Sequence, residues 1–245
     1  MERIDWAGTG WEELAARVGR VRLPGWDCTT GLVVGDGAAL LIDTGSSLRE
    51  GARLRADVRR LLGGDARVTH IALTHPHFDH VLGTAVFSGA EVYGAVGMDA
   101  LFAHPGARDE LCADAVRQGV DPAAAAEAAE LLVTPHHRVC GEWTLDLGGG
   151  VQVLLANIGP AHSGHDLVVC VPGTRETVFC GDLVEESGEP QAGPDAAPRH
   201  WPAALDRLLA LGGPDAAYVP GHGSVVNAGF LRAQRAELAA RFGVS

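Results

Sequence analysis

The stretch "THIALTHPHFDH", from Thr69 to His80, determines how the rest of the chain can be interpreted. Its first half is an apolar run of the kind that forms a buried strand, and it predicts a strand over residues 68–73. Strands usually end in turn-forming residues, but this one runs into three histidines and an aspartate. These side chains donate lone pairs to metal ions, so the stretch predicts a metal site directly after a strand.

The spacing within "HPHFDH" indicates two neighbouring metal positions rather than one. His75 and His77 are two residues apart, so in an extended backbone their side chains leave on the same face and could hold one ion. Asp79 and His80 follow after the chain has turned and would point to a second position. Two divalent ions about 3.5–4 Å apart are a known arrangement for hydrolysis.

Three isolated residues downstream have the same placement relative to predicted strands. His162 lies in "GPAHSGHD", after the apolar run "VQVLLA"; Asp182 lies in "FCGDLV", at the end of a strand predicted over residues 177–180; and His222 lies in "VPGHGS", in a loop after another strand. Strand ends can converge on one edge of a sheet, which is how open α/β folds build their sites. We therefore expect these residues to join the histidine cluster.

Together these motifs resemble a known family. "LLIDTG", "THPHFDH", "GPAHSGHD", "GD" and "PGHG", in this order, are similar to the motifs of the metallo-β-lactamase superfamily, over about residues 30–222. The resemblance implies an α/β fold, a four-layer αββα sandwich with a dinuclear metal site at one edge. It also implies a hydrolase in which a hydroxide bridging two metals attacks an electrophilic centre, with Asp79 as a catalytic proton carrier.

The resemblance also assigns ligands, position by position. Two Zn²⁺ ions per chain are expected, with iron or manganese as alternatives. Asp43 is expected to lie beneath the site and orient a ligand, and His165 to lie at its rim. The implied ligands are His75, His77 and His162 for the first metal, Asp79, His80 and His222 for the second, and Asp182 as a bridge between them.

The sequence as a whole predicts one domain over residues 1–245. Two short strands flank the turn "GDG", and helical spacing begins at Leu48, with Ser46 or Ser47 as the N-cap and Gly63 as the stop. Residues 98–135 are rich in alanine, with breaks at "HPG" and "VDP", and have too few large apolar side chains for a core of their own. They predict a helical insertion, and a further helix is expected over residues 201–211.

Composition excludes several other functions. The formal net charge is −12, and all 19 basic residues are arginines, which argues against a nucleic-acid or anionic-membrane partner and excludes a catalytic lysine Schiff base. The five cysteines never form a CxxC pair, as is usual in a reducing compartment. No window approaches the roughly 18 apolar residues of a membrane span, so a cytoplasmic location is expected. A homo-oligomer is compatible with the sequence.

The favoured substrate is a small ester, thioester or lactone. Asp182 in "GD" resembles the glyoxalase II-like and lactonase-like branches, whereas the β-lactamases of the superfamily usually lack this carboxylate. The alternatives are a β-lactam hydrolase, an iron-dependent sulfur dioxygenase and a non-catalytic binding module; the complete set of ligands argues against the last. Candidate substrate contacts are Trp26, Arg199 and Trp201.

Overall fold

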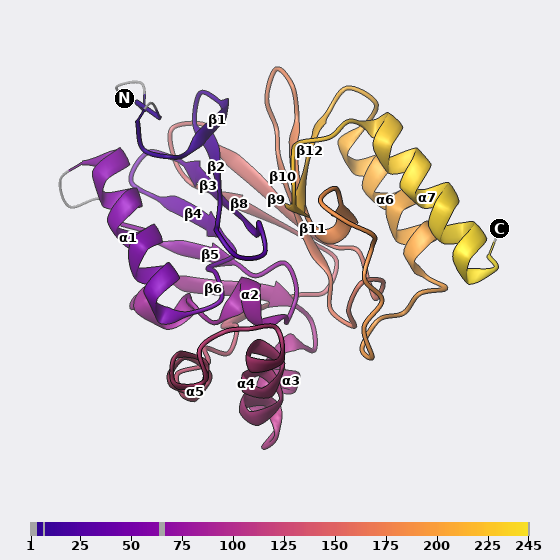
Figure 1. Cartoon of the computed structure of the whole chain (residues 1–245). Helices are drawn as coiled ribbons and strands as arrows, with labels where there is room; N and C mark the ends of the chain where they lie inside the picture. Colours follow the sequence, from indigo (N-terminus) through magenta and orange to yellow (C-terminus); the bar gives the residue numbers. More distant parts are fainter. Residues whose placement is uncertain (1–3, 7, 64–66, 245) are drawn as a thin grey trace.

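Two β-sheets packed face to face form the centre of the protein, seen here in a computed structural model that describes residues 4–6, 8–63 and 67–244 (Figure 1). Within these residues the first sheet has seven strands, in the order β1 (Glu12–Ala15), β2 (Val18–Arg22), β3 (Thr29–Val34), β4 (Ala39–Ile42), β5 (His70–Ala72), β6 (Glu91–Ala95) and β7 (His137–Val139). The second has five, in the order β12 (Ala217–His222), β11 (Thr177–Glu185), β10 (Leu167–Val171), β9 (Gln152–Asn157) and β8 (Glu142–Asp146).

Helices cover the outer face of each sheet. Helix α1 (Leu48–Leu62) lies against the first sheet, and α6 (Trp201–Gly212) and α7 (Ala228–Phe242) lie against the second (Figure 1). Two short elements, α2 (Phe78–Val81) and the 3₁₀ helix η1 (Thr84–Val86), follow β5. The expected four-layer αββα sandwich is therefore confirmed.

The alternation of side chains along each strand produces the three apolar layers. On β4, Leu40 and Ile42 face the second sheet, whereas Leu41 between them faces α1 and packs with Leu54 in the outer layer. Phe179 on β11 fills the space between the sheets. Because both faces of the central strands are covered, these strands are apolar throughout, as the short apolar runs in the sequence predicted.

Helix α1 is specified locally by its ends. The Ser47 side chain accepts a hydrogen bond from the Glu50 N–H and caps the first turn, and the helix stops at Gly63, which has a φ of 70°. Of the two expected N-caps, Ser47 is the one used. Ahead of the helix, β3 and β4 pair antiparallel across the "GDG" turn, as predicted.

The alanine-rich segment forms three helices, α3 (Met98–Ala103), α4 (Ala107–Arg117) and α5 (Pro122–Glu130), separated at the predicted breaks. They lie below the first sheet in Figure 1. Their buried residues, among them Phe102, Ala115 and Ala125, pack into the outer layer that α1 also covers. The segment thus shares the core of the first sheet, as its shortage of large apolar residues suggested.

The strand predictions differ from the structure in two respects. Strands β1, β2 and β7 were not predicted, because short strands that carry charged residues show no apolar run. β11 and β12 are longer than expected, so Asp182 and His222 lie within strands instead of after them. None of the described helices has the length and apolar character required to cross a membrane.

Candidate metal centre

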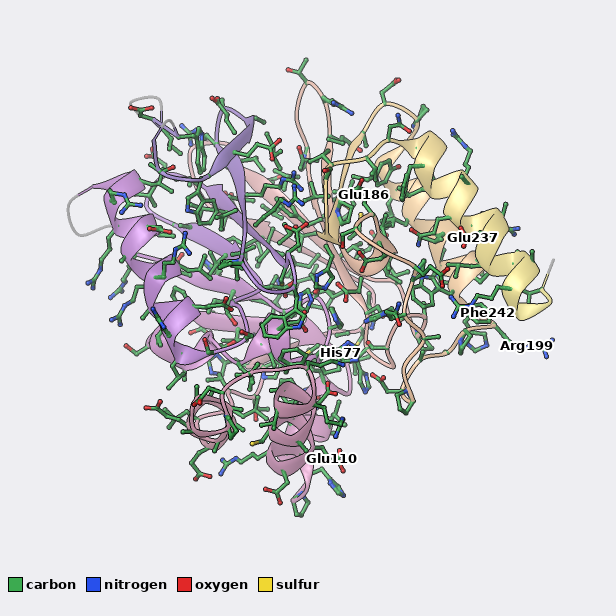
Figure 2. The ribbon with its side chains drawn as sticks, in the orientation of Figure 1. His77, Glu110, Glu186, Arg199, Glu237 and Phe242 are labelled. Carbon is green, nitrogen blue, oxygen red and sulfur yellow. The ribbon has the colours of Figure 1, made fainter. Side chains whose placement is uncertain are left out.

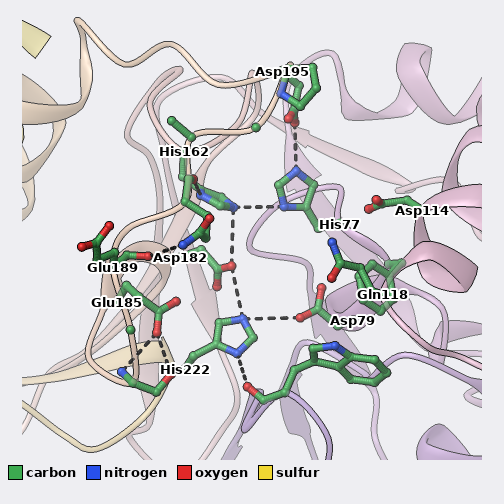
Figure 3. A pocket seen from close by; sticks show the side chains of 18 residues that line it. His77, Asp79, Asp114, Gln118, His162, Asp182, Glu185, Glu189, Asp195 and His222 are labelled. Carbon is green, nitrogen blue, oxygen red and sulfur yellow. Dashed lines mark hydrogen bonds and ion pairs between the residues drawn. The ribbon is translucent and has the colours of Figure 1, made fainter.

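Four separate segments bring the predicted ligands to one edge of the two sheets. The turn from β5 into α2 carries His75, His77, Asp79 and His80; the loop after β9 carries His162; and β11 and β12 carry the remaining two. Figure 3 shows His77, Asp79, His162, Asp182 and His222 around a common centre.

Two glycines allow Asp182 to face this centre from inside a strand. The register between β11 and β12 shifts at Gly181, whose φ of 54° is one that L side chains rarely adopt. On the neighbouring strand, a Cβ atom at Gly221 would lie 1.8 Å from Asp182 Oδ1, so only glycine leaves room for the carboxylate. The irregular stretch of β11 is what turns Asp182 inward.

Each of the five histidines has one ring nitrogen bonded to an oxygen on the side away from the centre. The outer contacts are His75 Nδ1 to Thr74 Oγ1 at 3.0 Å, His77 Nε2 to Asp195 Oδ2 at 2.9 Å, His80 Nδ1 to Asp43 Oδ2 at 2.8 Å, His162 Nδ1 to the Gln191 carbonyl at 3.1 Å, and His222 Nδ1 to the Trp26 carbonyl at 2.6 Å.

These contacts determine which nitrogen of each ring carries hydrogen. Carboxylate and carbonyl oxygens only accept, so the outer nitrogen must be the N–H donor. The Thr74 hydroxyl donates to Asp43 Oδ2 at 2.7 Å and is therefore an acceptor for His75. In the neutral rings, the inner nitrogen then presents a lone pair to the centre, which is the form that binds a metal.

The inner nitrogens lie closer together than lone pairs tolerate without a cation. His77 Nδ1 and His162 Nε2 are 3.0 Å apart, and a shared proton or a metal ion must lie between them. This separation is shorter than the summed length of two Zn–N bonds, each about 2.0–2.1 Å long, so both nitrogens can bind the same ion. His75 Nε2 and Asp182 Oδ1 are buried and have no hydrogen-bond partner in the described structure. The donor set therefore fits a metal ion.

Among the described residues, the potential ligand atoms form three groups: two share Asp182, and the third consists of Cys28, Asp79 and His80. His75, His77, His162 and Asp182 make up one group, and His80, His222 and Asp182 another. Asp79 lies beside the second group, with its Oδ2 3.4 Å from His222 Nε2 and 3.6 Å from His80 Nε2. The three histidines implied for the first metal thus lie in one group, whereas Asp79, implied for the second, falls outside the group of His80 and His222; Asp182 belongs to both groups.

Burial and charge set the protonation of these groups. Burial lowers the pKa of His162 to about 4 and that of His75 well below its usual range, so both rings are neutral at pH 7. Burial would raise the pKa of Asp182, but the adjacent His80 and His75 hold it well below its usual value. Burial would lower the pKa of His222, but Asp182 raises it to about 9, so this ring is protonated at pH 7 without a metal and a divalent cation would displace its proton.

Asp43 lies directly beneath this centre, on the loop after β4. Its φ of 61° is uncommon for a non-glycine residue, and its carboxylate accepts from His80 Nδ1, from the Thr74 backbone N–H at 2.8 Å and from the Thr74 hydroxyl. Asp43 therefore orients His80 directly and His75 through Thr74.

Cys28 was not singled out from the sequence, yet it lies against His80. Its Sγ is 3.8 Å from both ring nitrogens and donates to the Asp79 carbonyl at 3.3 Å. Cys28, Asp79 and His80 form a group whose ligand atoms lie within 4.8 Å of one another, so the sulfur is close enough to share an ion with His80. Burial raises the pKa of Cys28 to about 12, so the thiol keeps its proton at pH 7 when no metal is bound.

Three further residues support the site and were missed in the sequence. Asp166 is buried and accepts hydrogen bonds from the backbone N–H groups of Ala161 and Ser163, which shapes the loop that carries His162. The aspartate in "AHSGHD" was the only available signal. Asp195 and the Gln191 carbonyl belong to the segment between β11 and α6, which has no motif that could have pointed to them.

The centre opens into a pocket of about 450 Å³. Trp26 is among the residues that line it, together with Asp79, Asp114 and Glu189, which Figure 3 labels. Trp26 stacks edge-on against Phe78, with ring centroids 5.2 Å apart, and so forms an aromatic wall.

Two of the three expected substrate contacts do not reach this pocket. Trp201 is fully buried: its indole N–H donates to the Leu183 carbonyl and its ring packs 5.4 Å from that of His162. Arg199 is not among the pocket-lining residues and lies near the C-terminal end of α7, apart from His77 (Figure 2). The sequence could not distinguish these positions, because both follow the pocket-lining segment within a few residues.

Comparison with known proteins agrees with this geometry. The family profile of the metallo-β-lactamase superfamily matches residues 23–222. Among solved structures, a metallo-β-lactamase from Pontibacter korlensis superposes with a TM-score of 0.71 at 20% identity, covering 93% of this chain and 97% of that one. The metallo-β-lactamase FIM-1 from Pseudomonas aeruginosa, in its mono-zinc form, gives 0.69 at 18% identity, covering 96% of both chains.

At these identities the solved structures show the fold, and the family match spans the segments that carry all seven implied ligands. The chain is a metal-dependent hydrolase that belongs to the metallo-β-lactamase superfamily.

Proposed function

We propose that the protein is a dinuclear zinc hydrolase that cleaves a small ester, thioester or lactone. The observation that carries the proposal is the orientation of the five histidines: each is bonded outward through one nitrogen and directs the other to the centre. Structural histidines in a core have no reason to converge in this way, whereas metal ligands require it.

The two groups of ligand atoms that share Asp182 correspond, in the proposal, to two metal positions. In the proposal, His75, His77 and His162 hold the first ion; Asp79, His80 and His222 hold the second; and Asp182 contacts both. Bound divalent ions would supply Lewis acidity, which brings the pKa of water at the site towards about 7 and polarises the oxygen of a substrate carbonyl.

The chain's own residues then position the reactants and handle the proton. Asp79 lines the pocket and is within 3.4 Å of His222, so its carboxylate is placed to take a proton from the nucleophile and pass it to the leaving group. Asp43 and Asp195 keep His80 and His77 in the required tautomers. Trp26 and Phe78 form a wall against which a substrate can pack.

The charge of the pocket supports an uncharged acyl substrate over a β-lactam. Among the described lining residues there is no arginine, and the chain has no lysine, so a substrate carboxylate would find no cationic side chain. Instead, Asp114, Glu185 and Glu189 contribute negative charge. The solved neighbours named as β-lactamases share the fold at under 25% identity and do not set the substrate of this chain.

An activity screen with metal analysis in the same preparation tests the proposal. Zinc-loaded protein is assayed against nitrophenyl esters, acyl thioesters, lactones and β-lactams, while mass spectrometry measures the metals bound per chain. We expect about two zinc ions and turnover in at least one of the first three classes. Preparations rich in iron with oxygen uptake on a persulfide, or turnover of β-lactams alone, would overturn it.

A further inference from the structure

A second cavity of about 320 Å³ adjoins the metal pocket and differs from it in chemistry. It lies between α3, α4 and the segment that follows β11, and its walls include Pro76, Leu101, Phe102, Leu111 and Pro194. Figure 2 shows Glu110, another lining residue, on α4 on the side of the insertion below His77. Polar and apolar surface contribute about equally to the lining of the metal pocket, whereas the lining of this groove is mainly apolar.

The two cavities share walls. His77, Asp114, Pro194 and Asp195 line both of them, so a molecule bound at the metal centre can extend past His77 into the groove. Leu101 remains 38% exposed there, although it is a large apolar side chain on a short helix. Apolar surface left open beside a reactive centre gains most when a hydrocarbon covers it.

The charges at the junction disfavour an anionic occupant. Asp114 accepts a hydrogen bond from Arg117 at 2.9 Å, so the one guanidinium in the groove is already paired with a carboxylate. Glu110 and Asp195 add negative charge at the edges. A chain that ended in a carboxylate would meet these acids with no free cation among the described lining residues.

We propose that the groove between α3 and α4 binds an uncharged hydrocarbon chain of the substrate, so that the enzyme prefers medium-chain esters, thioesters or lactones to short or carboxylate-terminated ones. The inference rests on the proposed function and names the substrate class of the same site. The helical insertion is then the element that determines specificity, since α3 and α4 form most of the groove.

The test uses zinc-loaded protein and matched esters. One series varies the acyl chain of nitrophenyl esters from acetate to octanoate, and a second varies the alcohol chain of acetate esters, so the two arms show which side of the scissile bond enters the groove. Because burying one methylene group is worth about fourfold in affinity, kcat/KM should rise about two- to fourfold per methylene in one arm. The hexanoate ester should exceed the adipate monoester by at least about tenfold.

A matched pair of variants separates the groove from a general effect of charge. Leu101→Glu places a carboxylate in the groove and should reduce the hexanoate-to-acetate ratio of kcat/KM about tenfold or more. Leu131→Glu is the control, because Leu131 is 51% exposed on the same insertion but is not a lining residue, and it should leave the ratio unchanged. Metal content and Tm are measured for both variants.

Calorimetry with hexanamide and acetamide provides a readout that needs no turnover. Wild-type protein should bind hexanamide more tightly than acetamide, and Leu101→Glu should remove the difference. If no carbonyl compound is hydrolysed, the proposed function is wrong. The difference in affinity between hexanamide and acetamide then still tests whether the groove binds a hydrocarbon chain. Hydrolysis without a chain-length preference, a preference for the adipate ester, or equal effects of both variants would overturn the groove proposal alone.

Discussion

The two groups of histidines differ in the residues that accept hydrogen bonds from their outer ring nitrogens. In the group of His75, His77 and His162, two rings depend on the segment between β11 and α6: His77 bonds to Asp195 and His162 to the Gln191 carbonyl. In the group of His80 and His222, the outer partners are the buried Asp43 carboxylate and the Trp26 carbonyl. The first position thus depends on an exposed segment, whereas the second depends on a buried carboxylate and on the carbonyl of the half-buried Trp26.

This difference implies that the two metal positions respond differently to change. The Asp43 side chain is 2% exposed and accepts three hydrogen bonds, so His80 is oriented before any ligand arrives. Asp195 has a side chain that is 45% exposed and a single contact to His77, which makes this support easier to lose. We expect the first position to lose its metal more readily when the surface segment is altered.

Removing the carboxylate that both groups share should have the largest effect. In Asp182→Ala, four histidine contacts of 3.3–3.5 Å disappear, and both positions lose a ligand. Activity and zinc affinity should each fall more than about a hundredfold, beyond what the loss of an orienting residue causes. Calorimetry and metal analysis check this, with the exposed Glu127→Ala on α5 as control. Retention of two tightly bound ions would contradict a shared role.

Changing Asp43 to asparagine should weaken the second position directly, the first position through Thr74 and His75, and the fold as well. The amide can accept only through one oxygen, and its NH₂ group would face the Thr74 and His80 donors, so we expect a loss of about 3 kcal/mol in unfolding free energy. Urea denaturation of Asp43→Asn measures this, and Asp36→Asn in the exposed turn before β4 is the control. An unchanged midpoint would show that the three hydrogen bonds add little.

Asp195→Ala should affect one position and spare the other. Loss of an outer partner typically reduces metal affinity about 10- to 100-fold, and His77 belongs only to the first group. Stepwise zinc titration should therefore show one weakened and one unchanged site, with an unfolding midpoint near that of the wild type. Glu189→Gln lies in the same segment and should leave both sites intact. Equal weakening of both sites would contradict the proposed difference between the two metal positions in how their histidines are held.

The smallest effect is expected at His165, three residues after His162. Its Nδ1 contacts the Val96 carbonyl at 3.0 Å, and it is absent from the groups of ligand atoms. In His165→Ala, zinc affinity should stay within about twofold and the unfolding free energy within about 1 kcal/mol, because the lost hydrogen bond is exposed to water. A large drop in zinc affinity would mean that this histidine supports the loop of His162.

The sequence was informative wherever a residue and its function are local. His75 and His77 alternate on one short stretch, and a strand before them determines where they point. Ser47 and Gly63 delimit α1 through hydrogen bonds within one turn. The helical insertion was predicted because its alanines favour a helix, and its breaks contain the residues that end one.

The residues that hold the outer nitrogens of the histidines from distant segments could not be predicted from the sequence, for a physical reason. The Gln191 and Trp26 carbonyls are backbone atoms, which any residue type would provide, so no pattern of side chains signals them. Asp195 reaches across 118 sequence positions to His77, and Trp201 follows the same segment but turns into the core. Which of two nearby residues faces a pocket depends on the path of the chain.

By itself, then, the sequence determined the fold class and the chemistry of the ligands, since apolar periodicity and imidazole spacing are properties of short segments. Only the tertiary structure decided which nitrogen of each ring faces the centre, which residues hold the outer nitrogens and which groove adjoins the site. Those features arise where distant segments meet, and their energy comes from packing and hydrogen bonds that no single segment contains.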